Sequence, residues 1–368
     1  MPDLDLCFTP ATELAEGIRN RDLSSEAVVR NALERIEQVN GTLNCFVFTY
    51  PDEAIELARA ADAAVARGDE LGVLHGVPIA IKDLTPTAGK RTTFGSYAFE
   101  HHVPERSALL VERLLGAGAI MVGKTATPEF AYSSFTDSPL WGVTRNPWNT
   151  ERSPGGSSGG SAAALAAGFG PLSFGSDIGG SLRVPAHGVY AHKPTFGLVP
   201  MGGYGPPPLP PIRNSDLAVV GPMARTAADL ALALEVVAGP DEAREGIGYR
   251  LVPPPPRHAK LSEYRVLVMS THPLLPTGRD VRAAIDRLAD RLGKAGAQVS
   301  RANALLPDLK TSAPLYMRLL GAVRGAGLSA SGYAAARRSA AMLSADDHSL
   351  AAERARGAVI SHRDWIAR

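Results

Sequence analysis

The chain has 368 residues, a formal net charge of +1, 45% hydrophobic residues and 20% charged residues. These proportions are typical of a globular protein, and the length suits one large domain or two ordinary ones. A net charge so close to zero gives no electrostatic reason to expect nucleic acid or an anionic membrane as a partner.

The first part of the chain predicts helices that alternate with short strands. Apolar residues recur at helical spacing over residues 23–39. Residues 51–67 begin with a proline and two acids and end before a glycine, which also indicates a helix. Buried strands are expected at 76–83 and 119–122, with a helix between them that is capped by Ser107. This alternation predicts an α/β fold with a sheet between layers of helices.

Proline runs interrupt the second half of the chain at 205–211 and 250–257, and neither run can form a helix or a central strand. Beyond them, the sequence predicts a strand at 264–269, an amphipathic helix at 280–292 and Ala- and Arg-rich helices over 314–360. The C-terminal region is therefore expected to be mostly helical.

Cys7 and Cys45 are the only cysteines, too few for a disulfide framework or a Cys-rich metal site. The N-terminal residues carry acids where a signal peptide carries bases. No apolar run approaches the roughly 18 residues that a membrane span needs. A reducing cytoplasm is therefore the expected location.

Serine and glycine gather in two clusters, 153–161 and 175–183, on either side of an Ala-rich run. A flexible linker would be long, monotonous and flanked by polar sequence. Here the first cluster leads into a helix-forming run at 162–167 that is closed by Gly168. The second cluster follows an apolar run at 171–175, typical of a buried strand. We therefore expect a loop, a buried helix, a strand and a tight turn that together shape a site.

A serine hydroxyl is a useful nucleophile only when a nearby base takes its proton. Residues 156–160 match the Gly-x-Ser-x-Gly pattern of a nucleophile elbow, but residues 146–154 before them cannot form the buried strand that an elbow needs. No lysine follows the glycines as it would in a phosphate-binding loop. These patterns alone do not identify the nucleophile.

The other available base is Lys82, which lies near the end of the apolar strand expected at 76–83. Burial favours the neutral amine, which can accept a proton from a hydroxyl. A structural alternative is a strand-end lysine that reaches water or pairs with Asp83. The residues leave both interpretations open.

Several motifs in combination resemble the amidase signature family. They are residues 74–83, 123–125, 128–130, 144–148, 155–160 and 176–181. The resemblance covers nearly the whole chain. It implies one amidase signature domain over 1–368, with a central mixed sheet flanked by helices on both faces. The catalytic core would span residues 70–235, and a more helical region would span 260–368.

The resemblance also implies a Ser–cis-Ser–Lys triad. Ser181 would be the nucleophile that forms an acyl-enzyme, and Lys82 would be the neutral base. Ser157 would carry the proton between them, with the Gly156–Ser157 peptide bond cis.

Further roles follow for the neighbouring residues. The oxyanion hole would consist of the backbone N–H groups of Ile178, Gly179, Gly180 and Ser181. Glycines suit such a hole, because side chains would prevent several amides from converging on one oxygen. The candidates for substrate binding are Ser133, Ser134 and Gly156. The residues expected to give structural support are Ser158 in the loop and the oppositely charged Asp177 and Arg183 in the turn.

Two features depart from the family. The sequence stops before the last sheet strands of the family, which predicts a C-terminally incomplete fold. The stretch 185–194 is shortened between His187 and Gly188, close behind the nucleophile. Either departure could leave the triad poorly supported, and a misplacement of about 1 Å can cost about 100-fold in rate.

Three hypotheses for function follow. The leading one is a serine amidohydrolase that cleaves a small-molecule carboxylic amide to an acid and an amine or ammonia. The second is the glutamine-hydrolysing A subunit of a tRNA-dependent amidotransferase, which would need partner subunits. The third is an inactive truncated homologue. No motif implies a cofactor or metal, since His187 and His192 lack nearby acid or thiol ligands. The sequence predicts no nucleic-acid or membrane partner for the leading hypothesis and leaves a homodimer open.

Overall fold

The computed structural model describes residues 1–185, 187–207, 217–241, 251–252, 254–302 and 306–366. The chain forms two compact units, Met1–Leu251 and Val252–Arg368, and each is described by itself. The single domain over 1–368 and its predicted subdivision stay predictions.

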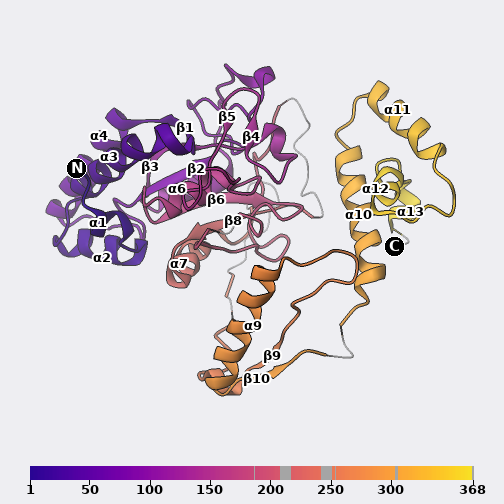
Figure 1. Ribbon diagram of the computed structural model, residues 1–368. Coiled ribbons are helices and arrows are strands. Elements are labelled where there is room, and N and C mark those ends of the chain that lie inside the picture. Colours follow the sequence, from indigo (N-terminus) through magenta and orange to yellow (C-terminus); the bar gives the residue numbers. More distant parts are fainter. Residues whose placement is uncertain (186, 208–216, 242–250, 253, 303–305, 367–368) are drawn as a thin grey trace. The chain divides into compact units, whose positions relative to one another are not determined.

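A mixed sheet of six strands forms the centre of the first unit (Figure 1). In spatial order the strands are β1 (Phe46–Thr49), β3 (Ile120–Thr125), β2 (Pro78–Lys82), β6 (Leu172–Asp177), β8 (Val219–Ala224) and β7 (Tyr190–Ala191). Strands β3, β2 and β6 run parallel, whereas β1, β8 and β7 join the sheet by antiparallel pairing. The mixed sheet is thus confirmed, and its parallel centre brings the C-terminal ends of β2 and β6 to the same edge.

Helices cover both faces of this sheet. In chain order they are α1 (Leu4–Phe8), α2 (Ala11–Asn20), α3 (Ser25–Leu43), α4 (Pro51–Arg67), α5 (Leu109–Gly116), α6 (Gly159–Ala166) and α7 (Ala227–Val237). One apolar core joins α2, α5 and α7 to Ile79 and Ile81 of β2, and a second joins α3, α4 and α6 to Ala80. Since alternate residues of a strand point to opposite faces, β2 contributes to both cores.

Shorter elements lie in the loops of this unit. They are the 3₁₀ helices η1 (Tyr97–Phe99) and η2 (Glu129–Ala131) and the antiparallel strands β4 (Asp137–Ser138) and β5 (Gly142–Val143).

Of two helix ends predicted from neighbouring residues, the C-terminal end of α4 is confirmed and the N-cap of α5 is wrong. The helix expected at 51–67 is α4, and Gly68 follows it in the left-handed conformation with φ of 78°. The expected N-cap of α5 was wrong. Ala108 precedes that helix without a side-chain cap, and the Ser107 hydroxyl instead accepts the N–H of Ala88 at 3.0 Å. Ser107 therefore stabilises a loop that is distant in sequence.

The Ser- and Gly-rich region is a structured segment and not a linker. Helix α6 follows the first cluster and leads, past Gly168 with φ of 79°, into β6. Its small residues are almost all buried. A Cβ atom on Gly160 would lie 2.5 Å from the backbone of Ala126, so only glycine lets α6 pack directly on the chain that follows β3.

The second unit is mostly helical, as its composition predicts. Its elements are η3 (Leu261–Glu263), β9 (Arg265–Leu267), α9 (Arg279–Lys294), β10 (Gln298–Ser300), α10 (Leu309–Gly325), α11 (Ala330–Ala341), α12 (Leu350–Gly357) and α13 (His362–Ile366). Strands β9 and β10 pair in parallel. Helices α10 and α12 pack closely at Gly357. An added Cβ on this residue would lie 2.0 Å from the Arg318 carbonyl oxygen, so only glycine allows the contact. Residues 208–211 of the first proline run, and 250 and 253 of the second, lie outside the described residues.

Candidate active site

Lys82 occupies the last position of β2, and its side chain is fully buried. The amine nitrogen Nζ lies 2.6 Å from Ser157 Oγ, 3.1 Å from Ser158 Oγ and 3.4 Å from Ser176 Oγ. All three neighbours of this amine are therefore neutral hydroxyls. The structure overturns the alternative in which Lys82 reaches water or pairs with its sequence neighbour.

Asp83 belongs to the opposite face of the sheet. Its carboxylate accepts hydrogen bonds from the backbone N–H and the hydroxyl of Thr93. A second buried lysine, Lys124, donates to the Thr85 carbonyl at 2.8 Å and to the Thr92 hydroxyl. Burial lowers the pKa of Lys124 and raises that of Asp83, and the two charges partly offset these effects. This network holds the loop after β2 and stays separate from the serines around Lys82.

The environment of Lys82 favours its neutral form. Burial lowers the pKa of this amine to about 7, although the negative charge of Asp177 acts in the opposite direction. A neutral amine carries a lone pair that can accept a proton from a hydroxyl. A substantial fraction of the side chain can thus act as a base near neutral pH.

The loop before α6 brings Ser157 to this amine. Its Gly156–Ser157 peptide bond is cis, in agreement with the resemblance. A Cβ on Gly156 would lie 2.9–3.0 Å from the backbone of Ser133, Ser134 and Phe135, so glycine allows these two loops to touch. The side chains of Ser133 and Ser134 are exposed there, beside the loop that carries Ser157. Their position is compatible with substrate contact, which stays a prediction.

Ser158 links the loop to the second cluster. Its backbone N–H donates to the Ser181 carbonyl at 3.3 Å, and its hydroxyl donates to the Ser176 carbonyl at 3.4 Å. A Cβ on Gly175 would lie 2.5 Å from Ser158 Oγ, so this glycine of β6 leaves the space that the hydroxyl fills. These contacts are consistent with a supporting role for Ser158.

The turn after β6 is built around the Asp177 carboxylate. It accepts the N–H of Gly180 at 2.9 Å and that of Leu182 at 3.0 Å, and Arg183 binds it with two hydrogen bonds of 2.8 and 3.0 Å. Burial alone would raise the pKa of Asp177, but the bonds from Arg183, Leu182 and Gly180 outweigh it and lower the pKa. The expected ion pair of Asp177 and Arg183 is present.

The same turn carries Ser181 and the expected oxyanion donors. Ser181 is 9% exposed, and no hydrogen bond joins its hydroxyl to Ser157 in the described part of the chain. The Gly180 N–H is directed at Asp177 and so helps to shape the turn. The amides of Gly179 and Ser181 have no hydrogen-bond partner among the described residues. The structure thus brings Lys82 and Ser157 into contact, and the role of Ser181 as the nucleophile stays a prediction.

Similarity to known proteins shows the family of the chain. A family model described as Amidase matches residues 27–356. The chain belongs to the amidase signature family.

The relatives of this amidase signature protein have several activities. It is 43% identical over 240 residues to the A subunit of the glutamyl-tRNA(Gln) amidotransferase of Carboxydothermus hydrogenoformans, covering 65% of this chain and 48% of the relative. It is 39% identical over 302 residues to the indoleacetamide hydrolase of Bradyrhizobium diazoefficiens, covering 81% of this chain and 56% of the relative. The chain therefore spans about half the length of these curated relatives.

A solved structure supports the same fold. The structure of a bacterial aryl acylamidase of the amidase signature family superposes with a TM-score of 0.75 at 26% identity. The match covers 98% of this chain and 74% of that one. The expected fold class is therefore confirmed.

Sequence reasoning missed two residues that support the candidate site. The first is Ser176, whose hydroxyl lies 3.4 Å from the Lys82 amine. Its position near the end of a predicted strand, like that of Lys82, could have indicated this contact, because parallel strands end at the same edge of a sheet. His187 was considered only as a metal ligand. Its ring instead contacts the Pro154 carbonyl and the Asn146 side chain, and so supports the loop before Ser157.

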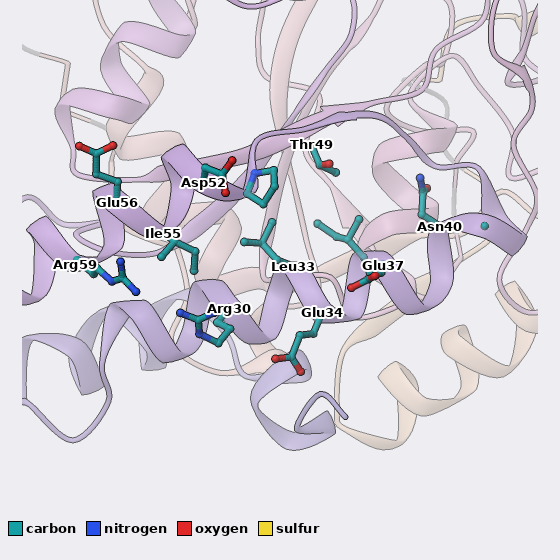
Figure 2. Close-up of a pocket in the computed structure, with 13 residues that line it drawn as sticks. Arg30, Leu33, Glu34, Glu37, Asn40, Thr49, Asp52, Ile55, Glu56 and Arg59 are labelled. Atoms are coloured by element: carbon teal, nitrogen blue, oxygen red, sulfur yellow. The ribbon is translucent and has the colours of Figure 1, made fainter.

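A cavity of about 1080 Å³ lies elsewhere, between α3 and α4 (Figure 2). Side chains from both helices line it, among them Leu33, Ile55, Arg30 and Arg59. Neither Lys82 nor the serines around it contribute to this lining. The cavity is thus distinct from the candidate active site.

Two kinds of feature are absent from the described residues. No group of three or more histidine, cysteine, aspartate or glutamate side chains is arranged to hold a metal ion among them. None of the described helices combines the length and the apolar character required to cross a lipid bilayer.

Replacing Arg183 with methionine should destabilise the first unit by about 1–3 kcal/mol, because it leaves the buried Asp177 carboxylate without its cation. The exposed position of the guanidinium keeps the loss below that of a fully buried pair. Urea unfolding measures the change. Arg67→Met is the control, since Arg67 and Asp69 form a more exposed ion pair. Equal stability of R183M and the parent would show that the pair does not hold the turn.

Proposed function

We propose that this amidase signature protein hydrolyses a carboxylic amide of a small molecule to an acid and an amine or ammonia, through an acyl-enzyme on Ser181. The observation that carries the proposal is a buried amine, with its pKa lowered to about 7, whose nitrogen lies 2.6 Å from Ser157 Oγ. An amine in this state is suited to accept a proton from a hydroxyl.

In the first half of the reaction, Ser181 Oγ attacks the amide carbonyl carbon. The Ser181 proton passes to Ser157 as the Ser157 proton passes to the neutral Lys82 amine. The carbonyl oxygen gains a negative charge, which backbone N–H groups of Ile178, Gly179 and Ser181 would stabilise. The carbon–nitrogen bond then breaks, and the proton returns from Lys82 through Ser157 to the departing nitrogen.

In the second half, water attacks the ester carbon of the acyl-enzyme. Its proton follows the same route to Lys82 and returns to Ser181 Oγ as the carbon–oxygen bond breaks. The net reaction adds one water molecule across the amide bond, and no cofactor is required for this sequence.

The Gly180 N–H changes one detail of the expected oxyanion hole. Since it is directed at Asp177, we assign it to the support of the turn and leave the charge on the substrate oxygen to the neighbouring amides. The chemistry needs only preorganised donors at the position of the oxyanion, and loss of one donor commonly costs about 10²–10³ in rate.

The alternative function is the glutamine-hydrolysing A subunit of a tRNA-dependent amidotransferase. The observation that favours it is the 43% identity to such a protein over 240 residues. The two functions differ in partners, because the amidotransferase component would act in a complex. Ammonia release from glutamine only after partner subunits are added would favour the alternative, and turnover of a simple aryl amide by the chain alone would favour the stand-alone enzyme. A cytoplasmic location and a homodimer stay predictions.

A fluorophosphonate probe tests the proposed function directly. We expect covalent modification of Ser181, located by mass spectrometry, with a rate that falls as the pH drops below about 7. The sign follows from Lys82: protonation of this amine removes the base, so activity is present above its lowered pKa and lost below it. An unmodified Ser181 would support the inactive-homologue hypothesis, and a rate that is flat between pH 5 and 9 would exclude Lys82 as the base.

A further inference from the structure

Thr136, which lies directly before β4, touches the loop that carries Ser157 at two places. Its hydroxyl donates to the Gly155 carbonyl at 2.8 Å. A Cβ on Gly159, the first residue of α6, would lie 2.2 Å from the same Thr136 oxygen. The Thr136 side chain therefore fills the space that the absent side chain of Gly159 leaves. One threonine thus contacts the chain on both sides of Ser157, two positions before it and two positions after it.

The segment that presents Thr136 is itself held from several directions. Thr136 is 2% exposed, and its carbonyl accepts the N–H of Thr144 at 2.9 Å. The hydroxyl of Ser138 in β4 donates to the Gly95 carbonyl at 2.7 Å, which ties the hairpin of β4 and β5 to the loop after β2. The Asn44 side chain, just after α3, donates at 2.7 Å to the carbonyl that precedes β5. Thr136 is therefore a firmly held support.

The Ser157 loop depends on this support at the Gly155 carbonyl. In the described part of the chain, this carbonyl accepts no hydrogen bond other than that from Thr136. Ser157 has to keep its hydroxyl close to the Lys82 amine, now 2.6 Å away, to exchange a proton with it. A displacement of about 1 Å can lower a rate by about 10²-fold. A hydroxyl that fixes the backbone two residues before Ser157 is thus placed to control this distance.

We propose that Thr136 is a positioning residue that holds Ser157 at proton-transfer distance from Lys82. It does so through its hydrogen bond to the Gly155 carbonyl and its contact with Gly159. The inference rests on the proposed function, because it takes Ser157 as the group that carries the proton to Lys82. It adds a residue that belongs to none of the motifs by which the sequence resembles the family. Without the Thr136 hydroxyl, the Gly155 carbonyl loses its partner, and the loop can adopt positions in which Ser157 no longer meets the amine.

Two replacements of Thr136 isolate the effect of its hydroxyl. Thr136→Ser removes the methyl group and keeps the hydroxyl, whereas Thr136→Ala removes both. We expect the fluorophosphonate probe to modify Ser181 about 10²-fold more slowly in T136A than in T136S, measured as the rate constant on its high-pH plateau. T136S should react at nearly the rate of the parent. Rescue by serine separates the hydrogen bond from the packing of the methyl group.

Thr144→Ala is the matched control, because Thr144 flanks the same hairpin and makes the same kind of bond. Its fully buried side chain donates at 2.7 Å to the Asn44 carbonyl and not to the Ser157 loop. T144A should therefore lower the unfolding temperature by about as much as T136A, since each loses one hydroxyl-to-carbonyl bond. It should leave the rate of modification at the parental value. Thermal unfolding of both variants provides the comparison.

Backbone hydrogen exchange reports the state of the loop without any reaction. Peptides that cover residues 155–160, analysed by mass spectrometry, should exchange faster in T136A than in T136S, and at the parental rate in T144A. If the parent protein is not modified at Ser181, the proposed function fails, and the exchange still decides whether Thr136 holds the loop. The inference is overturned if T136A and T136S react alike, if T144A shares the loss, or if exchange of these peptides is the same in T136A and T136S. It is equally overturned if T136A does not fold, which would give the hydroxyl a general structural role.

Discussion

Ser181→Ala is expected to lower amide hydrolysis by about 10⁵-fold to 10⁶-fold, because it removes the oxygen that forms the acyl-enzyme. The fold should be unaffected, since the contact of this residue with Ser158 uses the backbone carbonyl. Turnover of an aryl amide, with release of the amine followed by absorbance, measures the loss. The variant should also fail to react with the fluorophosphonate probe.

Ser161→Ala is the matched control for S181A. Ser161 is another buried serine of the same segment, but its hydroxyl contacts Thr125 and not Lys82. It should keep most of the activity of the parent. Turnover by S181A at a rate within 10-fold of S161A would identify a different nucleophile and end the proposed mechanism.

Lys82→Met should lower the same activity by about 10³-fold to 10⁴-fold, the contribution expected of a positioned general base. Methionine approximates the length and apolar stem of lysine but has no amine. The matched control is Lys124→Met, because Lys124 is also fully buried with its pKa lowered to about 7, yet it donates to Thr85 and Thr92. Similar losses in both variants would assign Lys82 a structural role.

The difference in stability between the parent and K82M should depend on pH in a defined direction. The pKa of Lys82 is about 7 in the folded chain and 10.5 in its ordinary state, so the unfolded chain binds an additional proton between these pH values. Stability rises with pH wherever the unfolded state binds more protons. The parent should therefore gain stability relative to K82M as the pH rises from about 7 to about 10, which urea unfolding at several pH values can measure. A constant difference would show that Lys82 titrates normally in the folded protein.

Much of the site could be predicted because it depends on residues with local signals. A lysine in an apolar strand is unusual, and Lys82 is indeed fully buried against serines. The Asp177 and Arg183 pair followed from opposite charges in a short turn. Helix α4 followed from a proline, acids and a glycine that all lie within its own sequence.

The rest depends on contacts between segments that no local pattern connects. Ser107 binds the backbone of Ala88 and does not cap the adjacent helix. The Gly180 N–H is directed at Asp177, and the three-dimensional course of the turn determines this direction. Periodicity shows which face of an element is buried, but it does not show which partner lies there.

The alternation of side chains along β2 places Lys82 on one face of the sheet and Asp83 on the other, even though they are adjacent in sequence. The pairing of Lys82 with Thr125, and of Ile81 with Lys124, fixes this arrangement. A slip of β2 by a single residue would exchange the faces and bring a carboxylate to the serines. That carboxylate would hold a neighbouring amine in its protonated form. Correct strand alignment is therefore a requirement for a neutral amine at this site, as well as for the two apolar cores that β2 joins.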